Sequence, residues 1–179
     1  MRAFVAIDVG PPLDPARRAR TDAPDHMTLR FLGEVAEDRI GPIGEALRAV
    51  LAPIPSFDLT LEGVGAFPTP DRPRVVWVGA TEGRGRAEEL ARASADALDG
   101  LGFPRETEAF VPHVTLFRVR SPRDRSRAAR LLDGTEPPPS PRTVRVTEVL
   151  LKESELTPSG AVHRTLERAP LAGPRASPG

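Results

Sequence analysis

The three histidines of this chain all stand in the same four-residue frame, His-x-Thr-Leu, and this repetition constrains the fold more than any other feature of the sequence. Residues 26–29 read HMTL, residues 113–116 read HVTL and residues 163–166 read HRTL. Side chains of a β-strand alternate between the two faces of its sheet. Each of the first two copies, folded as a strand, therefore presents an imidazole and a hydroxyl on one face and anchors two apolar side chains in a core with the other.

Apolar periodicity predicts a mixed order of strands and helices, without a strict strand–helix–strand alternation. Such an order favours an α+β fold with antiparallel sheets. One of the first two His-x-Thr-Leu strands falls in each half of the chain, which indicates two similar lobes packed face to face. Strands are predicted at Arg2–Asp8, His26–Leu32, Phe57–Leu61, Arg74–Val78, Val111–Val119, Thr143–Leu151 and Ala161–Leu166, helices at Glu37–Leu51, Arg86–Leu101 and Pro122–Leu132, and a proline-rich loop at 9–25.

Two such strands that face one cleft have the groups that phosphodiester chemistry needs. A neutral histidine can remove a proton from attacking water or a hydroxyl, and a protonated histidine can donate one to the leaving oxygen. The unperturbed histidine pKa of about 6.5 lets both forms exist near neutral pH. Threonine hydroxyls can donate hydrogen bonds to the nonbridging phosphate oxygens as charge builds there. This chemistry requires neither a metal ion nor another cofactor.

The frame alone does not say which two histidines work together. His26 and His113 each follow a proline closely, and each motif precedes a phenylalanine within two residues. His163 instead precedes charged residues near the C-terminus. These flanks predict His26 and His113 as the catalytic pair and a structural or surface role for His163.

Composition excludes several classes of protein and site. The chain has 179 residues and no cysteine, which excludes disulfides, thiolate zinc sites and a cysteine nucleophile. No apolar run approaches the roughly 18 residues of a membrane span, and the N-terminal run lacks the features of a signal peptide. The formal net charge is zero, so no global basic field attracts nucleic acid. We expect a soluble, cytoplasmic monomer without a membrane partner.

Four stretches, RAFVAIDV, HMTLRFLGEV, FPTPDRPRVVWVG and FVPHVTLFR, occur in this order along the chain. Together they resemble the 2H phosphoesterase superfamily, and in particular its RNA 2′,3′-cyclic phosphodiesterase branch, also called 2′–5′ RNA ligase-like proteins. The resemblance runs from Arg2 to about Leu171. It implies one bilobal domain at residues 1–171, with helices outside two antiparallel sheets and an active-site cleft between them. The composition of the last residues predicts a flexible tail at 172–179.

The resemblance also implies an activity, namely metal-independent hydrolysis of a 2′,3′-cyclic phosphate at an RNA or nucleotide end to a 2′-phosphate. Some members of the family also join RNA ends through a 2′–5′ linkage. By this likeness His26 protonates the departing O3′ and His113 activates water, although the sequence itself does not fix that direction. The residues that match substrate-binding positions of the family are Thr28, Thr115, Arg118 and Phe31.

Two of these positions conflict with simple strand geometry. In the family, Arg118 matches an arginine that contacts the phosphate or nucleoside, and Phe31 matches a residue that stacks on the terminal base. Strict alternation points both side chains away from the histidines. They reach the cleft only if each strand ends or twists before them.

The sequence departs from the family in two places. The segment between Asp8 and His26 is shorter than in relatives, which suggests a more open substrate rim. The chain has no tyrosine, whereas relatives often carry one near the C-terminal strand, close to the position of His163. The likeness therefore offers a second role for His163, as a stand-in for the missing aromatic beside the catalytic residues.

An arginine cluster follows the second motif, with only Asp124 as a nearby opposite charge. It is either a solvated helix face or a local groove for the RNA backbone. Its members are Arg118, Arg120, Arg123, Arg125, Arg127 and Arg130.

Other functions stay open from sequence. The substrate could be a small cyclic nucleotide or ADP-ribose cyclic phosphate instead of RNA. A noncatalytic nucleotide- or RNA-binding module would keep the same cleft, although binding alone needs no acid–base pair. A histidine metal site is a weak alternative, because no third ligand is evident.

Overall fold

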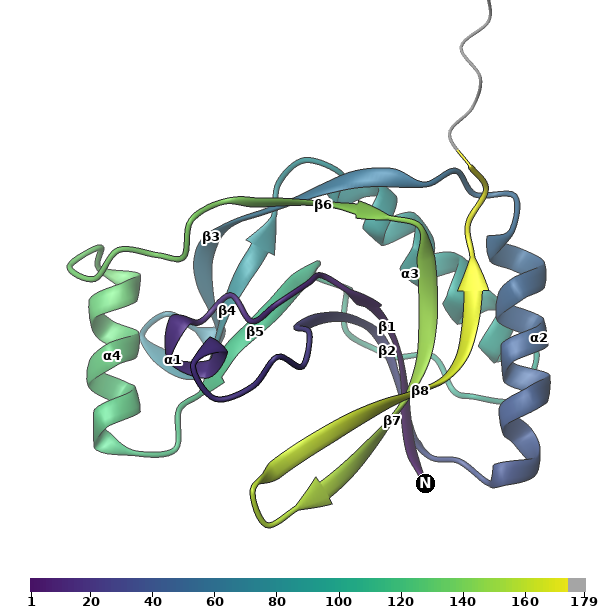
Figure 1. Ribbon diagram of the computed structural model, residues 1–179, viewed down its shortest axis with the longest axis horizontal. Helices are drawn as coiled ribbons and strands as arrows, with labels where there is room; N and C mark the ends of the chain where they lie inside the picture. Colours follow the sequence, from purple (N-terminus) through teal and green to yellow (C-terminus); the bar gives the residue numbers. More distant parts are fainter. Residues whose placement is uncertain (174–179) are drawn as a thin grey trace, which may run out of the picture.

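Two four-stranded antiparallel sheets form the centre of the computed structural model, which describes residues 1–173 (Figure 1). The predicted α+β class with two antiparallel lobes is therefore confirmed. The first sheet has the order β2 (His26–Glu34), β1 (Arg2–Asp8), β7 (Glu148–Thr157) and β8 (Gly160–Pro170). The second has the order β5 (His113–Arg118), β4 (Arg72–Ala80), β3 (Phe57–Thr69) and β6 (Arg142–Val146).

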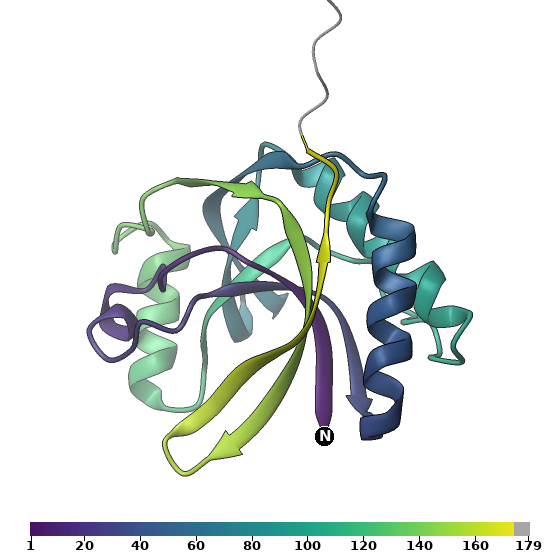
Figure 2. The ribbon, with the colours of Figure 1, turned by 45° about the vertical axis from the view of Figure 1, so that its right-hand side comes forward.

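Helices cover the two lobes from opposite sides (Figures 1 and 2). On one side α2 packs against β8 and α3, and α3 also contacts β2. On the other side α4 packs against β3 and β4. One cluster of buried apolar side chains runs through both lobes. The helices are α1 (Pro15–Arg18), α2 (Ile40–Leu51), α3 (Arg84–Asp99) and α4 (Pro122–Leu132), with a 3₁₀ turn η1 at Glu37–Arg39 before α2.

The predicted strand at Thr143–Leu151 is in fact two strands that belong to different sheets. Its first part is β6 in the second sheet, its last part is β7 in the first sheet, and only Thr147 lies between them. No glycine or proline marks the junction, so the sequence pattern runs through it without a break. For the other strands only the ends differ from the prediction. β3 and β8 are longer than predicted, and β5 begins at His113 instead of Val111.

The predicted loop at 9–25 contains one turn of helix, α1. Asp14 caps this helix by accepting a hydrogen bond from the Ala16 N–H, and Pro15 occupies its first turn. At the other end of the chain, Ala172 exchanges backbone hydrogen bonds with Ile54 and Ser56. The remainder of the predicted tail, 174–179, lies outside the described residues. No helix within residues 1–173 has the length and apolar character to cross a membrane.

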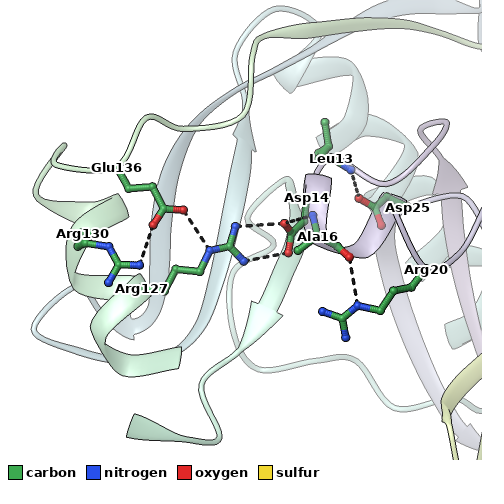
Figure 3. A network of polar contacts seen from close by, with 8 residues as sticks. All are labelled: Leu13, Asp14, Ala16, Arg20, Asp25, Arg127, Arg130 and Glu136. Atoms are coloured by element: carbon green, nitrogen blue, oxygen red, sulfur yellow. Dashed lines mark hydrogen bonds and ion pairs between the residues drawn. The ribbon is translucent and has the colours of Figure 1, made fainter. Parts of the chain in front are cut away.

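A charged network joins α4 to α1 (Figure 3). The Arg127 guanidinium donates to both carboxylate oxygens of Asp14, at 3.0 and 3.1 Å, and its Nε donates to Glu136 at 3.1 Å. Arg130 also pairs with Glu136. The expectation that Asp124 is the only acidic neighbour of the arginine cluster is therefore wrong, because Asp14 comes from a distant part of the chain.

Replacing Arg127 with alanine should destabilise the fold, because it leaves the nearly buried Asp14 carboxylate without its bidentate partner. We expect the free energy of unfolding to fall by about 2 kcal/mol, measured by urea denaturation at neutral pH. The matched control is Arg123→Ala on the same helix, which is exposed and makes no ion pair within residues 1–173. That control should change stability by less than about 0.5 kcal/mol. Equal effects of the two substitutions would contradict a structural role for the network.

Candidate active site

The two strands that carry the first two motifs lie beside each other between the lobes. β2 is an edge strand of the first sheet, β5 is an edge strand of the second, and the two strands are in contact. His26 pairs with Asp8 of β1, and His113 pairs with Gly79 of β4. The structure thus brings together two segments that are far apart in sequence, each with a half-buried histidine at its first residue.

Both strands carry a β-bulge at the leucine of the motif. The pairing of β2 with β1 passes over Leu29, and the pairing of β5 with β4 passes over Leu116. One extra residue shifts the alternation of side chains by one position. The residue five positions after each histidine therefore returns to the face that carries the histidine, called here the histidine face.

This shift brings Phe31 and Arg118 to the histidine face. The Phe4 ring lies 5.0 Å from the ring of His26 and 6.2 Å from that of Phe31, so all three share one face. Phe31 is 63% exposed. In the other lobe Arg118 pairs with Val75, which lies on the same face of β4 as Trp77, and the Trp77 ring contacts His113. The orientation that strict alternation predicted for Phe31 and Arg118 is therefore wrong.

His26 is surrounded by groups that disfavour its charged form. Its ring centroid is 4.8 Å from that of His163. The buried Lys152 lies close by, with its Nζ 2.5 Å from Asp8 Oδ1. Burial, followed by the charges of His163, Lys152 and Arg17, lowers the pKa of His26 to about 3. His26 is consequently neutral in the free protein at neutral pH.

The buried Nδ1 of His26 indicates which nitrogen of the neutral ring carries hydrogen. This atom has no hydrogen-bond partner among the described residues. A buried N–H without an acceptor costs about 1–3 kcal/mol, whereas an unpaired lone pair is tolerated more easily. The hydrogen of neutral His26 is therefore on Nε2, and this histidine offers a donor.

His113 has the opposite arrangement. Its Nδ1 lies 2.6 Å from the carbonyl oxygen of Val111. A carbonyl can only accept, so Nδ1 carries the hydrogen and Nε2 keeps a lone pair. Burial lowers the pKa of His113, and the bond to Val111 acts in the other direction. His113 therefore offers an acceptor where His26 offers a donor.

Aromatic packing holds His113 in this orientation. The Phe67 and Trp77 rings lie 4.8 and 5.8 Å from the His113 ring. The Trp77 ring in turn lies flat over Gly65, where an added Cβ would come within 2.3 Å of it. Glycine is thus required at position 65 for the tryptophan to lie beneath the histidine.

The two threonines share the histidine face with their motif partners. Thr28 and Thr115 are half-buried and stand two positions after the histidines, before the bulge. Neither hydroxyl makes a side-chain hydrogen bond within the described part of the chain. Both hydroxyls are therefore available to a ligand.

His163 lies inside this site and not at a remote surface. It stands on β8, half-buried, with its ring against both His26 and Phe4. The surface role predicted for His163 is therefore wrong, whereas the family likeness had pointed to a place beside the catalytic residues. Sequence analysis missed Phe4, Trp77 and Lys152, and the one signal for Lys152 was that it is the only lysine in the chain.

Apart from Arg118, three members of the arginine cluster are divided between ion pairs and a hollow that no histidine lines. Arg127 and Arg130 are held in ion pairs with Asp14 and Glu136. Arg125 lines a hollow of about 480 Å³ between α4 and the turn of β3 and β4, together with Arg72 and Arg74. Of the six arginines that the sequence grouped, only Arg125 lines this hollow, so the structure does not gather the cluster into one groove.

Within residues 1–173, no three or more histidine, cysteine, aspartate or glutamate side chains are grouped so that they could hold a metal ion. His26 and His163 adjoin Asp8, but its carboxylate is paired with Lys152.

Comparison with known proteins identifies relatives along most of the chain. The family model of the 2′-5′ RNA ligase superfamily matches residues 11–156. The RNA 2′,3′-cyclic phosphodiesterase of Aeropyrum pernix is 40% identical over 141 residues, 79% of this chain and 78% of that protein. The protein of the same name from Archaeoglobus fulgidus is 35% identical over 179 residues, 93% of this chain and 98% of that protein. The structure of E. coli LigT complexed with 3′-AMP matches with a TM-score of 0.72 and 27% identity, over 95% of this chain and 97% of that chain.

The opposite hydrogen positions of the two histidines can be measured directly. At neutral pH, long-range ¹H–¹⁵N correlation spectra should show His26 protonated at Nε2 and His113 protonated at Nδ1. Finding the hydrogen on Nδ1 of His26, or on Nε2 of His113, would contradict the assignment made from their surroundings.

The lowered pKa of His26 should make stability depend on pH. A histidine in the unfolded chain has a pKa of about 6.5, so as pH falls the unfolded state takes up the proton first. The contribution of neutral His26 is fully present above that value and is lost as pH falls toward the folded pKa of about 3. We expect His26→Gln to reduce the loss of unfolding free energy between pH 7 and pH 4.5 by roughly 2 kcal/mol, measured by urea denaturation. An unchanged pH dependence in this variant would rule out burial of a neutral imidazole.

Proposed function

Because the chain belongs to the 2′-5′ RNA ligase superfamily, we propose that it is an enzyme, an RNA 2′,3′-cyclic phosphodiesterase that opens a terminal cyclic phosphate to a 2′-phosphate without a metal ion. The relatives from Aeropyrum pernix and Archaeoglobus fulgidus carry that name. The observation that carries the proposal is that two strands in contact each begin with a histidine, and that the surroundings of the two rings favour a donor on His26 and an acceptor on His113.

In the proposed reaction each histidine handles one proton. Nε2 of His113 takes a proton from water, and the water oxygen forms a bond to phosphorus. The bond between phosphorus and O3′ breaks, and O3′ takes its electron pair and receives a proton from Nε2 of His26. The products are a 2′-phosphate and a free 3′-hydroxyl. An RNA 5′-hydroxyl in place of water would give the 2′–5′ linkage by the same steps.

His26 can act as an acid only after it gains a proton, because it is neutral in the free protein. A cyclic phosphate carries one negative charge, and an anion beside an imidazole favours the imidazolium form. Substrate binding and proton uptake by His26 are therefore coupled in this mechanism. The acid exists chiefly in the substrate complex, where its proton is needed.

Four further side chains would hold the substrate. Thr28 and Thr115 donate hydrogen bonds to the nonbridging oxygens, where negative charge increases in the transition state. Arg118 contacts the phosphate or the nucleoside through its guanidinium group. Phe31, exposed on the same face as His26, stacks on the terminal base. We also propose that the enzyme acts as a cytoplasmic monomer on RNA ends or on nucleotides with a cyclic phosphate.

The activity is tested by incubating the purified protein, in EDTA, with an oligoribonucleotide that ends in a 2′,3′-cyclic phosphate. We expect a 2′-phosphate product, identified by its resistance to a 3′-specific phosphatase and by mass spectrometry. A 3′-phosphate product would reverse the assignment of the leaving oxygen. No product in EDTA, with activity restored by a divalent cation, would falsify metal-independent hydrolysis.

Replacing either His26 or His113 with alanine should lower kcat/KM by roughly 10²–10⁴-fold. The wild-type rate should follow a bell-shaped pH profile, since one histidine must be neutral and the other protonated. A flat profile between pH 5 and pH 8 would exclude paired acid–base catalysis by these histidines. Val162→Ala, an exposed position on β8, is the control and should keep the wild-type rate.

A further inference from the structure

Two histidine rings from opposite edges of the first sheet meet on its histidine face. β2 and β8 are the outer strands of this sheet, with β1 and β7 between them. The rings of His26 and His163 are nevertheless only 4.8 Å apart between centroids, in an edge-to-face arrangement with an interplanar angle of 84°. The Phe4 ring packs against both, at 5.0 and 5.1 Å. The sheet therefore curls enough to hold His163 against the proposed acid.

Both rings have a buried nitrogen without a partner. Nδ1 of His26 and Nδ1 of His163 make no hydrogen bond to any described residue. While both rings are neutral, each can keep its hydrogen on Nε2 and leave an unpaired acceptor buried. A protonated His26 instead carries a second N–H on Nδ1, and a buried N–H without an acceptor destabilises the charged form.

The charged groups around the pair do not supply that acceptor. Burial lowers the pKa values of both histidines, and the cations Lys152 from β7 and Arg17 from α1 lower them further. A charged His163 also lowers the pKa of His26, so His163 can help a protonated His26 only while it is itself neutral. Asp8 from β1 is bound to Lys152 through Oδ1, and both Asp8 and the backbone of Glu153 on β7 act to raise the pKa of His163. Neither makes a hydrogen bond to Nδ1 of His26. The His163 ring lies against the His26 ring, with 4.8 Å between centroids, and its Nδ1 has no other partner among the described residues.

We propose that His163 is a positioning residue for His26, and that its Nδ1 accepts a hydrogen bond from Nδ1–H of His26 once a bound phosphate has brought a proton to that ring. This inference rests on the proposed function. His163 neither gains nor loses a proton in this step and keeps its own hydrogen on Nε2. The two nitrogens are not hydrogen-bonded in the free protein, so the proposal requires one ring to rotate when substrate binds. This hydrogen bond holds the His26 ring so that its Nε2–H is directed at the leaving oxygen.

Two substitutions of His163 distinguish the effect of its acceptor nitrogen from the effect of its aromatic ring. His163→Phe keeps an aromatic ring against His26 and Phe4 but removes the nitrogen, and His163→Asn places an amide oxygen near the position of Nδ1. We expect His163→Phe to lower kcat for the cyclic-phosphate oligonucleotide roughly 10- to 100-fold, with little change in KM. His163→Asn should recover most of that loss.

The pH profile distinguishes positioning from mere packing. Protonated His26 is lost as pH rises, so it sets the alkaline limb of the kcat profile, whereas neutral His113 sets the acid limb. Without its acceptor the imidazolium is less stable, and the alkaline limb of His163→Phe should move to lower pH by about one unit or more. The acid limb should stay in place. His163→Asn should return the alkaline limb toward its wild-type position.

Val162→Ala is the neighbouring control on β8, and thermal unfolding reports whether each variant is folded. A wild-type kcat and alkaline limb in His163→Phe would overturn the proposal, and so would an equal loss in both His163 variants. If His26→Ala and His113→Ala also left hydrolysis unchanged, the proposed function itself would fail. If those two abolished hydrolysis while His163→Phe did not alter it, only the role of His163 would fail.

A measurement on the wild-type protein does not depend on the folding of any variant. With inorganic phosphate at saturation, ¹⁵N spectra should show His26 protonated on both nitrogens and the Nδ1 resonance of His163 shifted as expected for an acceptor. A protonated His26 with an unchanged Nδ1 resonance of His163 would overturn the proposal.

Discussion

The contact between β2 and β5 is the constraint on which the rest of the site depends. Each strand is the edge of its own sheet, and each sheet orients one histidine with its own packing. In one lobe an unpaired buried nitrogen leaves the hydrogen of His26 on Nε2, and in the other the carbonyl of Val111 keeps it on Nδ1 of His113. Two lobes with similar strands thus present chemically opposite imidazoles.

Much of the fold follows from the sequence because its causes are local. Alternation within HMTL and HVTL predicts half-buried strands, and the order of elements predicts two antiparallel sheets, as observed. The bulges at Leu29 and Leu116 were not predictable, since no glycine or proline accompanies them. The contact of His163 with His26 depends on how far a sheet curls, which no short pattern encodes.

The catalytic roles of His26 and His113 stay predictions, although the structure sharpens their assignment. The sequence supplied the residue types and the family likeness but left open which histidine gives a proton. The direction that we propose rests on tertiary contacts, such as the 2.6 Å distance between His113 Nδ1 and the Val111 carbonyl oxygen. Tertiary contacts also decide the role of Arg127. The sequence grouped it with a possible RNA-binding cluster, but its partner Asp14, 113 positions away, holds it in a structural ion pair.

The junction at Thr147 has a mechanical consequence. One residue separates β6 in the second sheet from β7 in the first, and a single apolar cluster fills both lobes. Together with the contact between β2 and β5, this short connection ties the lobes into one body, so the two motif strands lie side by side before any nucleotide arrives. The entropy cost of bringing the two motif strands together is then met once, during folding, and not again in each catalytic cycle.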